Sequence, residues 1–211
     1  MSKSDRKTGY HHGDLRQALI DSALALIKEK QDAKTLSMRE VARQAGVSNA
    51  APYRHFADKD ALLAAVAEKG FRILASYLRE GVNSVPGEPL QQLQASGVAY
   101  VKFAIAYPSY YRVMFSAFQP GDTKSPDLNE AGLDAFGVLV EIIVGGQAVG
   151  QMRAGEPQQL AWVAWSLVHG LAMLVIERQL PLMDKASVVA FAELATQSLV
   201  EGMKVRGSRL G

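Results

Sequence analysis

The chain has 211 residues, of which 48% are hydrophobic and 21% are charged, with eight prolines. These values are typical of one or two folded domains and exclude disordered and collagen-like chains. The absence of cysteine excludes disulfides, thiolate metal sites and cysteine nucleophiles, and fits a reducing compartment. The first residues lack the apolar core of a secretory signal, so we expect a cytoplasmic protein.

The formal net charge of +2 is unevenly distributed along the chain. Residues 1–60 carry eleven Lys and Arg against eight Asp and Glu, whereas the remainder carries twelve against thirteen. His11, His12 and His55, three of the four histidines, also lie in the first 60 residues. This polarity fits a protein that brings one basic end to a nucleic acid, although the difference in charge is small.

The first part of the chain predicts short helices. Apolar positions repeat with a helical period throughout, and no segment alternates as a half-buried strand would. Asp14 precedes a first helix at about 14–30. Ser37 and Glu40 have the spacing of a capping box and start a short second helix. Gly46 can end that helix in a left-handed conformation.

The next stretch, residues 47–56, predicts a third helix of about two turns that contains Pro52, a residue without a backbone donor. If Ser48 is the N-cap, Pro52 is the fourth helical residue and only the outermost hydrogen bond is lost. If Asn49 is the N-cap, Pro52 is the third residue, whose N–H has no intrahelical partner. A capping Asn49 would use its side-chain oxygen on the backbone, whereas the Ser48 frame leaves the Asn49 amide free.

The rest of the chain also predicts helices. Asp58 caps a fourth helix that reaches about residue 78, and the turn-rich residues 82–89 follow it. The most apolar run, residues 160–176, is at the lower limit of length for crossing a bilayer, and we expect it in a core or a subunit interface rather than in a membrane. The prediction is an all-α fold of about nine helices, the last five at about 89–107, 108–118, 127–150, 156–178 and 184–205.

The second and third predicted helices are joined by Ala45-Gly46-Val47-Ser48, which is the arrangement of a helix-turn-helix. Residues 36–66 closely resemble the DNA-binding domain of TetR-type transcriptional regulators, and the similarity covers about residues 12–68. The family pattern ends in Tyr-x-His-Phe and Lys-x-x-Leu, which are here Tyr53, His55, Phe56, Lys59 and Leu62.

Two C-terminal stretches carry a second similarity. Residues 107–116 and 164–174 resemble the C-terminal domain type that is named for a Trp-His-Gly signature. In this sequence the signature residues are Trp165, His169 and Gly170.

The resemblance implies DNA-binding roles for individual positions. Ser48 would cap the recognition helix and touch a phosphate. The resemblance therefore favours Ser48 over Asn49 as the N-cap. Arginine reads guanine, asparagine reads adenine, and an alanine methyl packs on the thymine methyl, so base reading by several of these side chains is chemically sound. The implied base readers are Arg39, Asn49, Ala50 and Ala51, and the implied backbone contacts are Tyr53, His55 and Lys59.

The sequence departs from the family pattern at four positions. Ala50 and Ala51 stand where glycine and threonine are frequent, which removes one hydroxyl contact. Pro52 replaces a usual leucine. Arg54 replaces a usual aromatic residue and could contact a phosphate, contact a guanine or remain solvated. The basic residues of the flexible arm at residues 1–11, together with Arg16, could reach the minor groove or could simply be disordered.

The resemblance also implies that the C-terminal helices dimerise and enclose a cavity for a small-molecule effector. Such cavities are mostly apolar with a few polar groups. Each side chain could equally fill an ordinary core, and His169 fits a hydrogen-bonded buried histidine better than a ligand contact or a metal site. The candidate lining residues are Phe103, Tyr107, Tyr111, Met114, Phe118, Phe136, Trp162, Trp165, His169 and Met173.

Dimerisation has a physical argument as well. One short recognition helix covers few base pairs, so two copies are needed for specific binding. The helices at about 156–178 and 184–205 are the expected interface, because the first is apolar on more faces than one core can use. The expected division is an arm at 1–11, a DNA-binding domain at 12–60, a connecting helix at 61–80 and a ligand-binding and dimerisation domain at 81–211.

The expected function is therefore a homodimeric repressor that binds a palindromic double-stranded DNA operator and is released by a small molecule. No motif of hydrolases, phosphate loops or zinc proteases occurs, and we expect no catalytic residues, cofactor or metal. The alternative is a helical protein that binds or converts a small molecule without binding DNA. The sequence does not identify the effector, the operator or the regulated genes, and it does not decide between repression and activation.

Overall fold

The computed structural model describes residues 12–117, 124–181 and 184–205. These parts contain eight α-helices, one short 3₁₀ helix and no strand beyond an isolated bridge between Met152 and Lys204. The predicted all-α fold is confirmed. The elements in chain order are α1 (His12–Lys30), α2 (Met38–Gln44), η1 (Pro52–Arg54), α3 (Lys59–Asn83), α4 (Pro89–Ala106), α5 (Pro108–Ala117), α6 (Pro126–Ala148), α7 (Pro157–Ile176) and α8 (Lys185–Met203).

Local capping signals start several helices. Ser37 accepts a hydrogen bond from the Glu40 N–H at 3.3 Å, and the Glu40 side chain reaches back to the Ser37 N–H, which confirms the capping box of α2. Asp58 accepts from the Ala61 N–H at 2.8 Å and caps α3. Gly46 has φ +69°, the left-handed conformation predicted for it. Each of α4, α5, α6 and α7 begins with a proline, whose missing N–H is not needed at a helix start.

Two helix bounds differ from prediction. α1 begins at His12, two residues before the predicted cap Asp14, and α3 continues to Asn83 instead of ending near residue 78. The extension keeps α3 against α4, where the missing side chain of Gly81 lets the Ala95 carbonyl oxygen come within 2.9 Å of the position that a Cβ would occupy. α3 therefore ends within the predicted turn-rich stretch at 82–89, with Ser84 as its C-cap.

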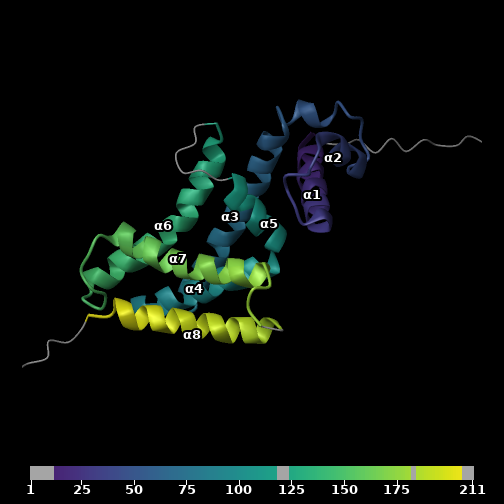
Figure 1. The fold of residues 1–211 in the computed structure, drawn as a ribbon. Coiled ribbons are helices and arrows are strands. Elements are labelled where there is room, and N and C mark those ends of the chain that lie inside the picture. Colours follow the sequence, from purple (N-terminus) through teal and green to yellow (C-terminus); the bar gives the residue numbers. More distant parts are fainter. Residues whose placement is uncertain (1–11, 118–123, 182–183, 206–211) are drawn as a thin grey trace, which may run out of the picture.

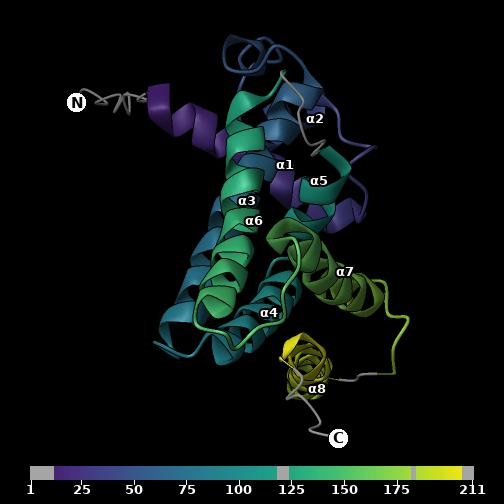
Figure 2. The same ribbon diagram turned by 90° about the vertical axis from the view of Figure 1, so that its left-hand side faces the viewer.

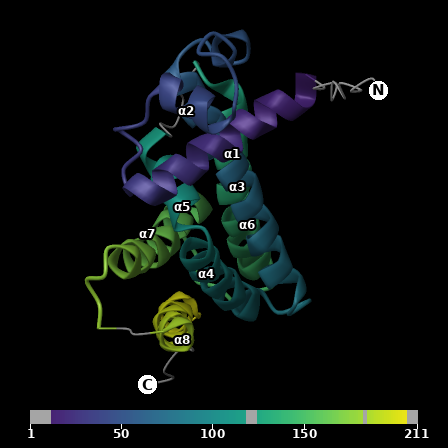
Figure 3. The same cartoon turned by 90° about the vertical axis from the view of Figure 1, so that its right-hand side faces the viewer.

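The helices form a small head and a larger body (Figure 1). The head consists of α1, α2, η1 and the first turns of α3. α3 leaves the head and runs beside α6, and α4 lies between this pair and the α7–α8 pair (Figures 2 and 3). α3 packs against α1 in the head and against α4, α5 and α6 in the body. It is thus the continuous element that joins the two parts.

The hydrophobic core extends through both parts. In the head it includes Leu19, Val41 and Leu62, all fully buried, and in the body it includes Phe103 and Ile143. α3 contributes buried side chains along its whole length, because apolar residues recur on one face at helical spacing. A displacement of body helices can therefore reach the head through packed side chains.

α6 and α7 are long and apolar enough to cross a membrane by length and composition alone. Helices of soluble proteins pass the same test. In α7 the buried residues, such as Leu160, Ala164 and Val168, face the body, whereas Val163 and Leu167 are exposed on another side. α7 therefore carries apolar side chains on its buried side and on an exposed side.

Candidate functional site

The segment from Ser48 to Phe56 forms a turn followed by the 3₁₀ helix η1. The Ala51 N–H donates to the Ser48 carbonyl at 3.0 Å, and the Arg54 N–H donates to the Ala51 carbonyl at 3.2 Å. Both bonds span three residues, as in a 3₁₀ helix. The predicted two-turn third helix is therefore replaced by a tighter and shorter one.

Pro52 is the first residue of η1, and Ala51 precedes it as the cap residue without a side-chain hydrogen bond. Neither Ser48 nor Asn49 is the N-cap of η1, so both predicted starting points of the helix are wrong. At the first position of a helix the backbone N–H has no intrahelical partner, so the missing proline N–H costs no hydrogen bond. The Pro52 carbonyl accepts hydrogen bonds from the N–H groups of His55 and Phe56, each at 3.0 Å. Asn49 does not cap η1, and its side chain is exposed.

Most side chains with predicted DNA-binding roles are exposed in the head. Pro52 and Phe56 are buried and hold the segment on the head. The Tyr53 side chain is 55% exposed, although tyrosine is a large and partly apolar residue. The exposed members of the set are Arg39, Ser48, Asn49, Ala50, Tyr53 and Arg54, and the partly buried ones are Ala51, His55 and Lys59.

Contacts within the head fix this surface. The Arg16 guanidinium lies over the Phe56 ring, 5.3 Å from its centre, so Arg16 belongs to the packing of α1 on η1. Lys30 at the end of α1 pairs with Glu40 of α2 at 2.6 Å, and this hydrogen bond lowers the pKa of the Glu40 carboxyl group. Lys59 Nζ donates to the Lys34 carbonyl at 3.1 Å. The expected arm at residues 1–11 lies outside the described residues.

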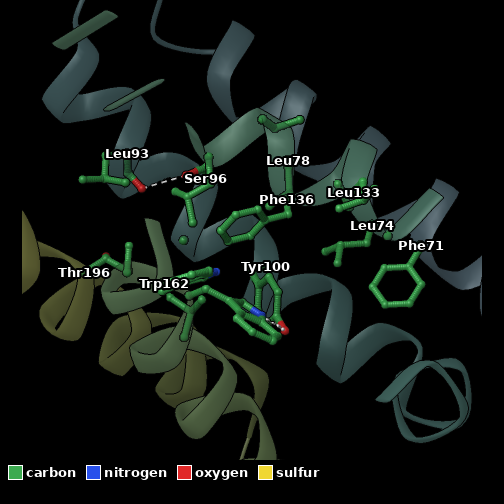
Figure 4. A pocket seen from close by; sticks show the side chains of 18 of the residues that line it. Phe71, Leu74, Leu78, Leu93, Ser96, Tyr100, Leu133, Phe136, Trp162 and Thr196 are labelled. Carbon is green, nitrogen blue, oxygen red and sulfur yellow. Dashed lines mark hydrogen bonds between the residues drawn. The ribbon is translucent and has the colours of Figure 1, made fainter. Parts of the chain in front are cut away.

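A second feature is a cavity of about 220 Å³ in the body. Side chains from α3, α4, α6, α7 and α8 surround it, together with Phe115 of α5 (Figure 4). Among the residues that the structure describes, no charged side chain lines it. The lining includes Phe71, Leu74, Leu78, Leu93, Ser96, Tyr100, Leu133, Phe136, Leu139, Gln158, Trp162, Ala164, Trp165, Val168, Thr196 and Leu199.

Three of the ten predicted ligand-binding residues, Phe136, Trp162 and Trp165, line the cavity. The others lie elsewhere. Tyr111 and His169 belong to a polar cluster beside it, and Met114 packs where Gly70 has no side chain. Phe103 and Tyr107 make edge-to-face contacts with Tyr77 outside the lining, Met173 is partly buried and does not line the cavity, and Phe118 lies outside the described residues.

The lining from α3, α4, α5 and α8 is absent from the sequence-based prediction. Phe71, Leu74 and Leu78 occupy positions i, i+3 and i+7 of one helical face, and this spacing is the signal that could have identified them. Thr196 and Leu199 of α8 carry no comparable signal, because their approach to α4 depends on how distant helices pack.

A polar cluster closes one side of the cavity. The Trp165 indole N–H donates to the Tyr100 hydroxyl at 3.2 Å, which lies 3.1 Å from the Tyr111 hydroxyl. The Tyr111 hydroxyl lies 2.7 Å from His169 Nδ1. Burial lowers the pKa of His169 and raises those of Tyr100 and Tyr111, so neutral forms are favoured. A neutral His169 that is protonated at Nε2 accepts at Nδ1, and in this tautomer each donor of the cluster has an acceptor.

Arg112 of α5 connects the head to the body. Its guanidinium donates to the Gln31 side-chain oxygen at 2.8 Å at the end of α1, and it pairs with Glu177 at 3.3 Å at the end of α7. It also donates to the Ile176 carbonyl at 3.5 Å. Gln31 has φ +56° and Arg178, next to Glu177, has φ +55°, a conformation that non-glycine residues seldom adopt. We call these contacts the Arg112 joint.

The described residues contain no cluster of His, Asp and Glu that could hold a metal ion. The described residues therefore include exposed arginines in the head, a partly open apolar cavity in the body, and helices that join the two parts.

Two family profiles match the chain. "Bacterial regulatory proteins, tetR family" matches residues 19–66, and "Tetracyclin repressor-like, C-terminal domain" matches residues 93–199. Among curated relatives, the HTH-type transcriptional regulator AcrR of Shigella flexneri is 34% identical over 89 residues, which cover 42% of this chain and 41% of that protein. The chain covers 32% of an uncharacterised regulator from Haemophilus influenzae, so these relatives match over less than half of their length.

Solved structures match over most of the chain. A protein of unknown function from Rhodococcus sp. RHA1 is 33% identical with a TM-score of 0.80, and the match covers 94% of this chain and 100% of that one. The regulator FadR from Bacillus subtilis in complex with stearoyl-CoA is 17% identical, with a TM-score of 0.72 and coverage of 89% and 98%, which shows a shared fold.

The Trp-His-Gly assignment of the C-terminal part stays a prediction. The two family profiles together match most of the length from residue 19 to residue 199, one of them over the segment that contains η1 and the other over the segment that encloses the cavity. The chain belongs to the TetR family of bacterial transcription regulators and carries a helix-turn-helix DNA-binding domain at its N-terminal end.

Proposed function

We propose that the protein is a homodimeric repressor in the cytoplasm that binds a palindromic operator and is released by a small molecule. The observation that carries this proposal is the exposure of side chains in the helix-turn-helix segment: Arg39, Asn49, Tyr53 and Arg54 are all exposed. Arginine and asparagine are the side chains that read guanine and adenine in the major groove. The proposed parts are the arm at 1–11, the DNA-binding domain at 12–60, the connecting helix at 61–80 and the effector and dimer domain at 81–211.

Exposed apolar side chains on α7 and α8 support the homodimer. On α7, Val163 is 55% exposed and Leu167, Gly170 and Leu174 follow on the same face at helical spacing. On α8, Leu194 is 62% exposed, beside Phe191. A helix pair with apolar faces on the outside is best covered by the same pair from a second copy. This matches the predicted interface through the last two helices.

The cavity and the Arg112 joint support regulation by a ligand. Ligand in the cavity would contact α3 and α7, and both helices also connect to the head, through the chain and through Arg112. A ligand acts by binding one arrangement of the heads more tightly than another. The stearoyl-CoA held by Bacillus subtilis FadR supports the idea that this fold accommodates effectors.

Selection of bound sequences from a random DNA pool tests the proposal. We expect a recovered palindrome whose half-sites lie about one helical turn, or a multiple of it, apart. Recovery of no sequence at low salt would contradict a DNA-binding role. Turnover of a small molecule by the same preparation would then support the alternative, a helical enzyme or carrier without DNA binding.

A further inference from the structure

The cavity also indicates the chemical class of its ligand. We infer that the effector is an uncharged, mainly apolar, ring-containing molecule that carries one hydrogen-bond donor, such as a substituted phenol. This inference rests on the proposed function, because it assumes that the cavity is the effector site. Four properties of the lining carry it: its volume, its lack of charge, its aromatic rings and the state of its hydroxyl groups.

The volume limits the size of the ligand. The cavity measures about 220 Å³. This is roughly one and a half times the volume of the engineered protein cavity of about 150 Å³ that binds benzene. A substituted single ring or a small fused ring system matches this space. A long acyl chain does not match it unless the helices move apart.

The lack of charge excludes acidic and basic ligands. No described lining residue is charged, and most of the lining is hydrocarbon or aromatic. A carboxylate or phosphate placed among these side chains would lose its water without gaining a counter-ion, which is costly. The nearest polar group at the rim is the exposed amide of Gln158, in the first turn of α7. An amide does not compensate a buried charge.

The aromatic rings favour a ring-shaped ligand. Trp165 makes an edge contact with Phe136 at 6.3 Å and a tilted contact with Phe115 at 6.1 Å between ring centres. These three side chains line the cavity together with Trp162 and Tyr100 (Figure 4). A ligand ring inserted among them can make further edge and offset contacts of the kind that stabilise aromatic clusters.

The hydroxyl hydrogens of the lining already take part in hydrogen bonds within the protein. Ser96 donates to the Leu93 carbonyl at 2.8 Å, and Thr196 donates to the Ala192 carbonyl at 2.7 Å. With the Tyr100 hydroxyl engaged in the polar cluster, these groups offer lone pairs to a ligand but no hydrogens. A ligand O–H or N–H can be accepted at these buried hydroxyl groups. The remaining donors of the lining, the Trp162 indole N–H and the Gln158 amide, belong to exposed side chains. A ligand that donates a hydrogen bond is therefore favoured in the buried part of the cavity.

The test compares two para-propyl-substituted rings of similar size with the full-length protein, para-propylphenol and para-propylbenzoate. Isothermal titration calorimetry measures affinity, and tryptophan fluorescence reports where each probe binds, because the two tryptophans of the chain, Trp162 and Trp165, both line the cavity. We expect the phenol to bind at least about a hundredfold more tightly than the ionised benzoate, since only the benzoate must bury an unpaired charge.

Two variants test whether the probes bind in the cavity. Ala164→Leu adds bulk to the buried lining and should weaken phenol binding about tenfold or more, with an unchanged circular dichroism spectrum as the control for folding. Gln158→Arg places a cation at the rim of the cavity. Because Gln158 is exposed, this substitution should not disturb folding. It should strengthen benzoate binding about threefold or more relative to phenol binding.

The inference is wrong if the benzoate binds wild-type protein as tightly as the phenol, if saturating phenol leaves tryptophan emission unchanged, or if folded Ala164→Leu binds phenol normally. Operator binding, measured in parallel, separates this failure from that of the proposed function. Protein that binds operator but no phenol refutes only the ligand class. Protein that binds phenol in the cavity with no change in operator affinity refutes regulation through this cavity.

Discussion

Replacing Gly170 by alanine should stabilise the protomer and weaken the dimer. Gly170 lies within α7 on the exposed face that Val163 and Leu167 share, and a Cβ added to it would meet no atom within 4 Å. Alanine in place of glycine inside an exposed helix gains up to about 1 kcal/mol in the free energy of unfolding. Within one protomer nothing opposes this gain.

Across a two-fold interface the added methyl groups have the opposite effect. An extra methyl group in a close-packed contact costs about 1 to 3 kcal/mol, and two-fold symmetry introduces it twice. At the lower limit the dimer loses about 2 kcal/mol, which raises its dissociation constant about thirtyfold. The gain within each helix and the loss at the interface can be measured separately, because only the second depends on protein concentration.

Sedimentation equilibrium measures the dissociation constant, and circular dichroism at low concentration, where protomers dominate, measures unfolding. Gly145→Ala is the matched control, since Gly145 lies in the last turn of α6 and a Cβ there also meets no atom within 4 Å. We expect the control to leave dimerisation unchanged. A Gly170→Ala protein that is more stable and dimerises like wild type would refute a close helix contact at this face.

Three further predictions concern the head, the joint and the polar cluster. Tyr53→Ala should weaken DNA binding for all sequences, whereas Arg39→Ala should relax base preference at one position by about 1 to 3 kcal/mol, and unchanged selection profiles for both would contradict the proposed surface. Arg112→Met should speed hydrogen exchange in the last turn of α1, whereas Arg72→Met, which removes only a pair within α3, should not; equal exchange in both would refute the joint. Burial lowers the folded-state pKa of His169, so the unfolded chain binds the extra proton first, and the free energy of unfolding should fall as the pH drops below about 6.5. Urea titrations of His169→Asn should show a smaller loss over that range, and an equal loss would contradict the neutral histidine.

Local signals made much of the fold predictable. The caps Ser37 and Asp58 and the prolines at the starts of α4 to α7 act within one helical turn, so the sequence alone identifies them. The form of η1 was not predictable in this way. Pro52 is compatible with a helix that begins at Ser48 and also with a turn followed by a 3₁₀ helix. The structure has the second form, in which Pro52 and Phe56 are buried against the head.

The side chains with proposed DNA contacts could be predicted from the sequence more readily than the lining of the cavity. Tyr53, Asn49 and Arg54 could be assigned from one contiguous motif, and the structure places their side chains at the surface. The cavity combines residues from six helices, and aromatic content in the C-terminal part identifies only those that happen to face it, such as Phe136 and Trp165. Phe71 and Thr196 enter the lining because α3 and α8 approach α4 in space, which helical periodicity does not specify.

The Arg112 joint also has a consequence for how the two sites respond to one another. Thermodynamic linkage requires that a ligand which lowers operator affinity by some factor is itself bound more weakly, by the same factor, when the operator is present. If the ligand acts by moving the end of α7 away from Arg112, DNA that holds the end of α1 in place also resists that movement. Effector affinity measured on free protein would then overstate the affinity of the protein that sits on its operator.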